Sequence, residues 1–326
     1  MTTTLLSAHA RRQFRRQLLR WFDREKRTLP WRGETDPYRI LVSEVMLQQT
    51  RVTVVKERYN KFLQQFPSVL RLAAAREESV LAAWSGLGYY RRARALHAAA
   101  KSVRKNRAFP HSAAQLLQLP GIGRYTAAAV ASIAFGEPVA VVDGNVKRVL
   151  QRLSGRELSP DAHWHAAQDL LEERQPGDFN QAMMELGATV CLPGQPLCTR
   201  CPVSRFCASR GASGKSVSSP QARKKATLSY LLAQKEDGTV FLRQRSPDVS
   251  LMPGMWELPL LRNKPADSRH PVLKLRHSIT TTDYSILVFS SSRARLDAGV
   301  WVTLSSAHRL PLTGLTRKIL GKLGVF

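Results

Sequence analysis

Two acidic residues, Glu44 and Asp143, stand in sequence contexts that suit them to catalysis. Glu44 lies in "DPYRILVSEVMLQQT", which has the periodicity of a helix. Its neighbours on one helical face are Ile40, Leu41, Leu47 and Gln48. On so apolar a face an ionised carboxylate is poorly solvated, and we expect the pKa of Glu44 to rise toward that of a general acid. The alternative is a glutamate on the helix surface, which is the commoner place for one.

Asp143 follows the apolar run "PVAVV" and precedes "GNVKRVLQRL". Its position favours an N-cap, since Asp is among the best capping residues. An Asp at the start of a helix also stays ionised beside the helix dipole, so a cap and a catalytic anion are compatible. Cleavage of a glycosidic bond requires one carboxylic acid to protonate the leaving group and one carboxylate to stabilise the cationic sugar. Glu44 and Asp143 fit these two roles if the fold brings them together.

All four cysteines fall within "CLPGQPLCTRCPVSRFC", with the spacing C-x6-C-x2-C-x5-C. A disulfide framework fits badly, because the protein has the character of an intracellular one. Structural zinc usually uses two compact C-x2–4-C pairs, and this run has one. Four thiolates on one short loop, one followed by proline, favour an iron–sulfur cluster over zinc. The expected ligands are Cys191, Cys198, Cys201 and Cys207.

The segment "LQLPGIGRYTAAAVASIAF" places Pro-Gly-Ile-Gly between two helical stretches. Gly121 and Gly123 leave backbone N–H groups open to a ligand, and the positive end of a helix follows them. An ordinary helix–helix turn is the alternative. Together with the basic charge, the pattern favours a site for a DNA phosphate, and Arg124 and Lys147 are further candidate DNA contacts.

The chain has 50 basic and 24 acidic residues among 326, a formal net charge of +26, and both halves are basic. So large an excess of one sign indicates a polyanionic partner, with DNA or RNA favoured over an anionic membrane surface. No apolar run approaches the ~20 residues of a membrane helix. We find no secretory signal, and we expect a cytoplasmic protein. The Arg-rich start could resemble a transit peptide, but Phe14, Leu18, Trp21 and Phe22 form the stripe of an amphipathic helix.

Composition and periodicity along the chain predict two domains. Residues 1–210 are rich in helical periodicity, residues 211–226 have the composition of a linker, and residues 227–326 form the second domain. There "ATLSYLLAQ", a "KEDG" turn and "TVFLRQR" predict a β-hairpin. "DYSILVFSS" and "GVWVTL" predict further strands, and "TGLTRKILGKLG" predicts a closing helix. The fold class is therefore α+β.

Several of these motifs resemble one known family. "LPGIGRYTAAAV" with "VVDGNVKRVLQRL" resembles the helix-hairpin-helix DNA glycosylases, and the cysteine run resembles the four-iron four-sulfur loop of their endonuclease III and MutY branches. "LPWR", "SEVMLQQTRV", "GLGYYRRARAL" and "NQAMMELGA" are similar to the MutY branch, the adenine DNA glycosylases. The resemblance covers residues 20–210. It extends more loosely to "LMPGMWELP", which resembles the Nudix-like recognition domain of that branch.

The resemblance implies an enzyme that removes adenine paired with 8-oxoguanine, or with G, from double-stranded DNA. It implies a helical catalytic domain made of a six-helix module and a [4Fe-4S] module. Glu44 would protonate the flipped adenine and Asp143 would stabilise the sugar, with Tyr125 and Asn145 orienting both. The residues that would line the adenine pocket are Trp31, Arg32 and Glu185, and those that would probe the duplex are Gln49 and Tyr89. Aromatic residues flanked by apolar ones are more often core, which is the alternative for Trp31 and Tyr89.

Two positions refine this expectation. Endonuclease III relatives carry a Schiff-base lysine where this chain has Tyr125, so we expect a glycosylase without lyase activity. The family's Phe-Ser-His type loop falls on Ile279, Thr280 and Thr281, where Thr280 keeps a hydroxyl for substrate binding. The second domain lacks the clustered glutamates of a Nudix hydrolase, so it should bind without hydrolysing.

The alternatives are an endonuclease III-like glycosylase/lyase acting on oxidised pyrimidines, and a non-catalytic binder of damaged DNA. For the favoured reading we expect a monomer that acts at the bacterial nucleoid and does not bind membranes.

Overall fold

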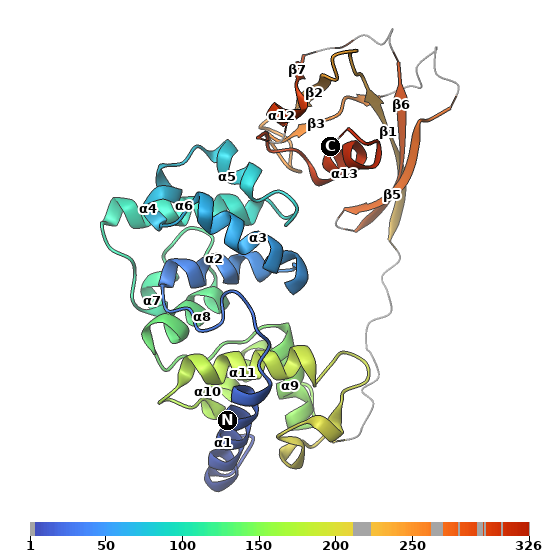
Figure 1. Cartoon of the computed structure of the whole chain (residues 1–326). Coiled ribbons are helices and arrows are strands. Elements are labelled where there is room, and N and C mark those ends of the chain that lie inside the picture. Colours follow the sequence, from blue (N-terminus) through green and yellow to red (C-terminus); the bar gives the residue numbers. More distant parts are fainter. Residues whose placement is uncertain are drawn as a thin grey trace. The chain divides into compact units, whose positions relative to one another are not determined.

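The computed structural model describes residues 4–210, 223–261, 270–279, 281–291, 296, 298–307 and 309–325. Close packing divides the chain into two compact units, shown in Figure 1. The first combines Met1–Ala74 with Ala95–Ser219, and the second combines Ala75–Arg94 with Pro220–Phe326. Most of the predicted linker, residues 211–222, lies outside the described residues, so the predicted domain boundaries stay a prediction.

The first unit is helical (Figure 1). Its helices are α1 (Ala8–Glu25), α2 (Pro37–Leu47), α3 (Val52–Gln65), α4 (Val69–Ala74), most of α6 (Arg91–Asn106), α7 (Ala113–Leu116), α8 (Arg124–Phe135), α9 (Gly144–Ser154), α10 (Pro160–Leu170) and α11 (Pro176–Thr189). Two short 3₁₀ turns, Cys198–Arg200 and Ser204–Phe206, follow in the cysteine run. The amphipathic stretch near the start of the chain and the stretch around Glu44, both predicted to be helical from their periodicity, form α1 and α2.

Amphipathic packing builds the core around α1. The predicted stripe is confirmed: Phe14, Leu18, Trp21 and Phe22 are all buried. They pack with apolar residues of α8, α9, α10 and α11 in one continuous cluster. Burying a large apolar side chain contributes roughly 1.5–3 kcal/mol, so this stripe anchors α1 to the unit.

Local signals set the helix ends that matter for the site. Asp36 caps α2 by accepting from the Tyr38 backbone N–H at 2.8 Å, with Pro37 in the first turn. The turn between α7 and α8 contains Gly121, whose φ of +72° favours glycine. A Cβ there would also overlap the Ala95 side chain. Glycines in the left-handed conformation end α8 at Gly136 and α9 at Gly155.

The described residues of the second unit form two short helices, two small sheets and a closing helix. The described strands are β1 (Lys224–Leu232), β2 (Val240–Gln244), β3 (Trp256–Glu257), β4 (Leu260–Leu261), β5 (Leu273–Ile279), β6 (Thr282–Ser290) and β7 (Val300–Val302), and the helices are α5 (Glu77–Ala83), α12 (Leu304–Ala307) and α13 (Gly314–Lys322). One sheet has the order β4-β1-β6-β5 with β1 and β6 parallel, and the other has the order β3-β2-β7. Leu315, Ile319 and Leu320 of α13 pack into the apolar cluster of these sheets.

The predicted hairpin over residues 226–245 forms only at its turn. Lys235 and Thr239 pair across the turn, and Gln234 bridges to Val240. Beyond that bridge the strands separate, because β1 pairs with β4 and β6 while β2 pairs with β3 and β7. The predicted turn is confirmed, but the predicted pairing of the two strands is wrong, because each strand pairs within a different sheet.

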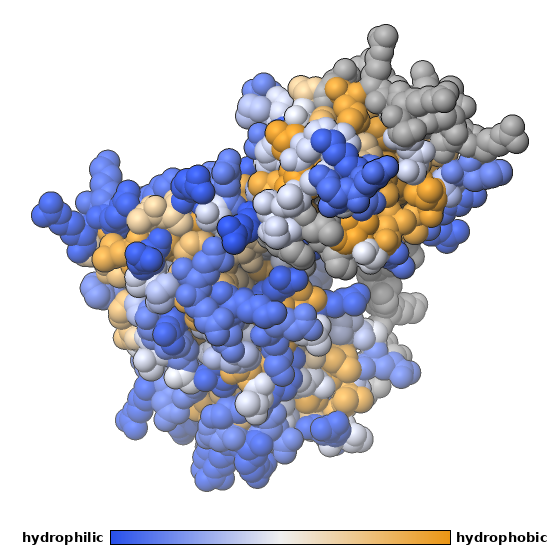
Figure 2. Space-filling view, turned by 45° about the horizontal axis from the view of Figure 1, so that its top comes forward, coloured by the Kyte–Doolittle hydropathy of each residue, from blue (hydrophilic) through white to orange (hydrophobic). Residues whose placement is uncertain are grey.

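Figure 2 shows hydrophilic side chains over most of one face, with smaller hydrophobic patches among them. Among the described residues, no helix is long and apolar enough to cross a membrane.

Candidate active site

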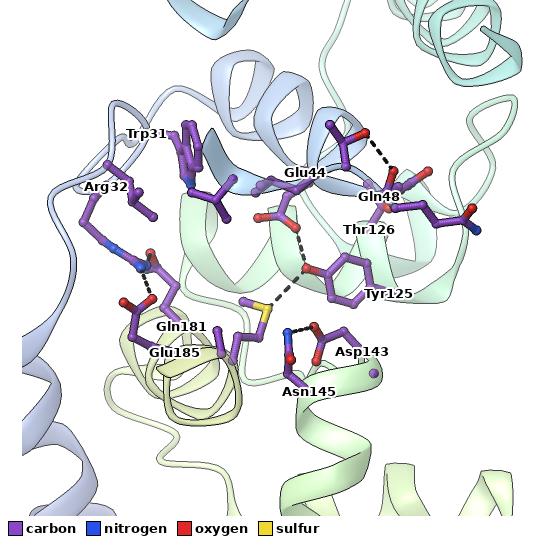
Figure 3. A pocket seen from close by; sticks show the side chains of 18 of the residues that line it. Trp31, Arg32, Glu44, Gln48, Tyr125, Thr126, Asp143, Asn145, Gln181 and Glu185 are labelled. Atoms are coloured by element: carbon purple, nitrogen blue, oxygen red, sulfur yellow. Dashed lines mark hydrogen bonds and ion pairs between the residues drawn. The ribbon is translucent and has the colours of Figure 1, made fainter. Parts of the chain in front are cut away.

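A cavity of about 710 Å³ opens in the first unit, and it gathers most of the residues predicted from the sequence (Figure 3). Its walls come from the turn before α2, from α2, from the first turns of α8 and α9, and from one face of α11. The predicted site residues that line it are Trp31, Arg32, Glu44, Gln49, Gly121, Gly123, Tyr125, Asp143, Asn145 and Glu185.

Glu44 projects into this cavity from the buried face of α2 and is 5% exposed. The Tyr125 hydroxyl donates a hydrogen bond to its Oε2 at 2.6 Å. Burial raises the pKa of Glu44 to about 7; the Tyr125 hydrogen bond opposes the rise, and the negative charge of Asp143 adds to it. The predicted rise is confirmed, and a substantial fraction of Glu44 is protonated at neutral pH.

Asp143 caps α9 and also faces the cavity. Its Oδ1 accepts from the Val146 backbone N–H at 2.7 Å, and its Oδ2 accepts from the Asn145 amide at 2.9 Å. Burial raises its pKa, and these hydrogen bonds hold the rise back. The cap and the cavity-lining carboxylate are thus the same side chain, as the sequence allowed.

Glu185 forms a second charged wall with two arginines. It accepts from Arg27 Nε at 2.6 Å and from Arg32 Nη2 at 2.8 Å. Burial alone would raise the pKa of Glu185, but the hydrogen bonds and charges of the two arginines hold it below its usual value. Arg32 also contacts Gln181 and lies 5.0 Å from the Phe22 ring centroid. This wall is a rigid set of donors and acceptors beside the acid.

Other predicted site residues fall in different settings. Trp31 lines the cavity but is also core, since it is 8% exposed and packs edge-on against Tyr59. Gln49 is exposed at the end of α2, with a φ of +54°. Tyr89 belongs to the second unit, is 53% exposed and has a φ of +48°, so its side chain is no core residue. Thr280 lies outside the described residues.

The glycine turn before α8 borders the same cavity. Gly123 begins α8 without a side-chain cap, which leaves the positive end of the helix to other ligands. Arg124 and Lys147 are exposed and do not line the cavity. The Arg124 guanidinium lies 3.9 Å from the centroid of the Trp164 ring, in a cation–π contact.

Four cavity residues on α11 follow the helical spacing i, i+3, i+4, i+7: Gln181, Met184, Glu185 and Ala188. Sequence reasoning found only Glu185 among them, and this spacing could have found the rest. Met184 places its sulfur 3.2 Å from the Tyr125 hydroxyl. Gly187 precedes Ala188 on the same helix, and a Cβ at Gly187 would stand 2.6 Å from the Cβ of Asn145. Gly187 thus permits the close approach of α11 to α9.

The four cysteines line one small hollow behind α9. Burial raises the pKa of Cys201 to about 11 and also raises that of Cys207, and the other thiols add to both shifts. Arg152 Nη1 lies 3.2 Å from the sulfur of Cys191, a contact suited to a negatively charged sulfur cluster. Within the described residues, no three His, Cys, Asp or Glu side chains converge as they would around a single metal ion. Four thiols with an arginine beside one of them are the kind of donor set that a sulfur-ligated cluster uses, and the cluster stays a prediction.

Arg148 connects the cysteine run to the cavity. Its Nε donates to the Cys191 carbonyl at 2.7 Å, and its Nη2 donates to Asn145 Oδ1 at 2.8 Å and to the Gly187 carbonyl at 2.7 Å. No sequence motif singled it out, because two of its three partners lie 39 and 43 positions away in the chain.

The helices α7 and α8 on either side of the glycine turn form a helix-hairpin-helix. The uncapped start of α8 and two carboxylates, Glu44 and Asp143, lie on one cavity. A family model described as "HhH-GPD superfamily base excision DNA repair protein" matches residues 42–172. A solved thermostable thymine-DNA glycosylase is 31% identical, with a TM-score of 0.58 over 62% of this chain and 97% of its own. The chain belongs to the HhH-GPD superfamily of base excision DNA repair proteins.

Adenine DNA glycosylases are among the similar proteins. The human protein is 48% identical over 214 residues, which cover 60% of this chain and 39% of the human one. The Arabidopsis thaliana protein is 37% identical over 314 residues, which cover 81% of this chain and 50% of the plant one. The chain thus spans about half the length, or less, of these curated relatives.

Proposed function

We propose that the protein is an adenine DNA glycosylase, which hydrolyses the N-glycosidic bond of adenine paired with 8-oxoguanine, or with G, in duplex DNA. One observation carries the proposal: Glu44 and Asp143 line a single cavity, with the pKa of Glu44 raised to about 7. The names of the human and plant relatives support adenine as the base that is removed.

In this mechanism Glu44 is the general acid. A carboxylic acid with a pKa near neutrality holds a proton and can still release it, which suits protonation of adenine N7. The proton makes the purine a good leaving group, and the same carboxylate then activates the attacking water. Tyr125 holds Oε2 in place, so the other carboxyl oxygen is the one that faces the base.

Asp143 stabilises the cationic sugar. Its carboxylate is fixed by the Val146 N–H and by Asn145, so its charge is positioned before the reaction and does not need to reorganise. Arg32 and Glu185 shape the wall against which the flipped adenine rests, beside Trp31. Gly121, Gly123, Arg124 and Lys147 contact the backbone of the duplex, with the open end of α8 taking a phosphate.

Tyr125 stands where a Schiff-base lysine would be needed for strand cleavage, and a phenol forms no imine. The activity is therefore base release without lyase chemistry. We further propose that Cys191, Cys198, Cys201 and Cys207 bind a [4Fe-4S] cluster. When bound, the cluster would cross-link the loop. Arg148 and Arg152 hold that loop against α9.

The second unit would be the Nudix-like domain that reads 8-oxoguanine, together with Gln49 and Tyr89. Ile279 and Thr282 pair at the end of β5 and the start of β6, and Thr281 lies in the turn between the two strands. At positions 279–281 the sequence would offer threonine hydroxyls and no imidazole to the lesion. The protein would act as a monomer in the cytoplasm, at the nucleoid.

The deciding experiment is base release from an 8-oxoguanine:A duplex by the wild-type protein and by Glu44→Gln. We expect Glu44→Gln to bind the duplex and to release no adenine. Normal turnover by the variant would remove Glu44 as the acid. Efficient nicking without alkali, with borohydride trapping that depends on Lys147, would indicate the lyase alternative. Binding without base release by the wild type would indicate a non-catalytic binder.

A further inference from the structure

Helix α1 carries six arginines, and the structure separates them into two groups with different roles. Arg11 and Arg15 are used by the fold: Arg11 pairs with the Asp169 carboxylate, and Arg15 donates from Nε to the Leu170 carbonyl at 2.9 Å. Arg15 also donates to the Asp169 carbonyl at 3.1 Å, which satisfies the C-terminal end of α10. These two arginines hold α1 against its neighbour.

The other four, Arg12, Arg16, Arg20 and Arg24, are exposed, and we call them the arginine row. None of their side chains forms an ion pair or a hydrogen bond with another described residue. They recur every four residues, so they follow a ridge that turns by about 40° around the helix at each step of about 6 Å, over about 18 Å in all. Like charges at this spacing repel one another, so the row makes α1 less stable than neutral residues would. The fold does not need the row.

The row lies outside the catalytic cavity. Arg12 and Arg16 border a separate hollow of about 600 Å³, and Arg24 borders another of about 580 Å³ with Arg200 of the cysteine run. Arg174 adds a cation to the first hollow, where Glu172 is the acidic residue.

Near the other end of the row the acidic residues are Asp23 and Glu25, and the Oδ1 atom of Asp23 lies 3.5 Å from the Nζ atom of Lys26. Positive charge therefore prevails along the row. Figure 1 shows α1 at one end of the first unit.

The geometry selects among polyanions. A membrane-bound amphipathic helix inserts its apolar face into the lipid, but the apolar face of α1 is buried in the core of the unit. A small anion would be held by converging donors, whereas these cations are spread along the helix. Duplex DNA is an extended polyanion with one charge per about 1.7 Å of its axis, which suits cations spread over about 18 Å.

We propose that the arginine row is a second binding surface for duplex DNA, separate from the catalytic cavity. It would hold an undamaged DNA segment while the cavity engages another, and so let the protein move between segments. Contacts of this kind read no sequence and need no lesion. The proposal does not depend on which base the cavity excises.

The test is the number of undamaged 12-bp duplexes that one protein binds at low salt, measured by sedimentation velocity. We expect two for the wild type and one for the variant R12Q/R16Q/R20Q/R24Q. Glutamine keeps the helix propensity of arginine, and circular dichroism checks the fold. Contact with about four phosphates should weaken the second binding event by about 100-fold between 50 and 200 mM salt. Base release by this variant at saturating substrate should equal that of the wild type.

The matched control is K101Q/R104Q/K105Q/R107Q, which removes the same charge from exposed positions on and just after α6. We expect it to bind two duplexes. A wild type that binds one duplex, or a row variant that still binds two, would overturn the proposal. Equal loss in both variants would make the effect one of net charge and also overturn it. If the row variant lost only its binding to phosphatidylserine vesicles, the partner would be a membrane and the proposal would be wrong.

Discussion

The hydroxyl of Tyr125, in the first turn of α8, donates to Oε2 of Glu44 across 2.6 Å, although the two residues are 81 positions apart in the chain. The bond joins the helix that follows the glycine turn to the helix that carries the candidate acid. It favours the ionised form of Glu44 and so works against burial, which favours the protonated form. The pKa of Glu44 is the balance of the two.

Tyr125→Phe tests this balance. Without the hydroxyl we expect the pKa of Glu44 to rise above about 7. The rise should be about one unit, since a hydrogen bond to a charged group contributes roughly 1.5 kcal/mol. Glu44 acts in its protonated form, so the alkaline limb of the single-turnover rate of adenine release should move to higher pH. Tyr38→Phe is the control, because that hydroxyl donates to the Phe66 carbonyl away from the cavity. An unmoved limb in Tyr125→Phe would contradict the assigned role.

Glu44→Gln should make the protein more stable at high pH. The pKa of Glu44 is raised from 4.5 to about 7, so the folded state binds a proton that the unfolded state has lost between these values. Stability therefore falls as pH rises through this window, by up to about 3 kcal/mol, and glutamine removes the dependence. Urea unfolding at pH 5 and pH 8 measures it. If Glu44→Gln increases the free energy of unfolding no more at pH 8 than at pH 5, the pKa of Glu44 is not raised.

Arg148→Met should loosen the link between the cysteine run and Asn145. Methionine keeps an apolar stem but leaves the Cys191 carbonyl, Asn145 Oδ1 and the Gly187 carbonyl without the guanidinium. We expect a loss of about 2–3 kcal/mol in the free energy of unfolding. Adenine release should fall as well. Lys147→Met, at the exposed neighbouring position, should change stability by less than about 0.5 kcal/mol. Equal effects of the two substitutions would show that Arg148 is an ordinary surface cation.

Gly187→Ala should push α11 away from α9. The added methyl carbon would lie 2.6 Å from the Cβ of Asn145 and 3.0 Å from its Cα, where there is no space for it. Overpacking of this kind costs about 1–3 kcal/mol. Gly321→Ala on α13 meets nothing within 4 Å, and it should stabilise the helix. Thermal unfolding compares the two. A Gly187→Ala protein as stable and as active as the wild type would contradict the close approach.

Much of the helical unit was predictable, because helix periodicity and caps are local. The stripe of Phe14, Leu18, Trp21 and Phe22 identified a buried face, and the position of Asp143 identified a cap. The strands were harder to predict. A "KEDG" turn indicates a hairpin, but β1 and β2 part after one bridge, since the partners of a strand lie far along the chain.

The sequence by itself determined which side chains could do chemistry: an acid on an apolar helix face, an aspartate at a helix start and four closely spaced thiols. Each follows from neighbours within a turn or two of helix, which the order of residues specifies directly. Only the tertiary structure placed Glu44 and Asp143 on one cavity, set Tyr125 against the acid and divided the arginines of α1 into two used by the fold and four left open. These relationships depend on how whole helices pack, and packing joins residues whose separation along the chain carries no local signal.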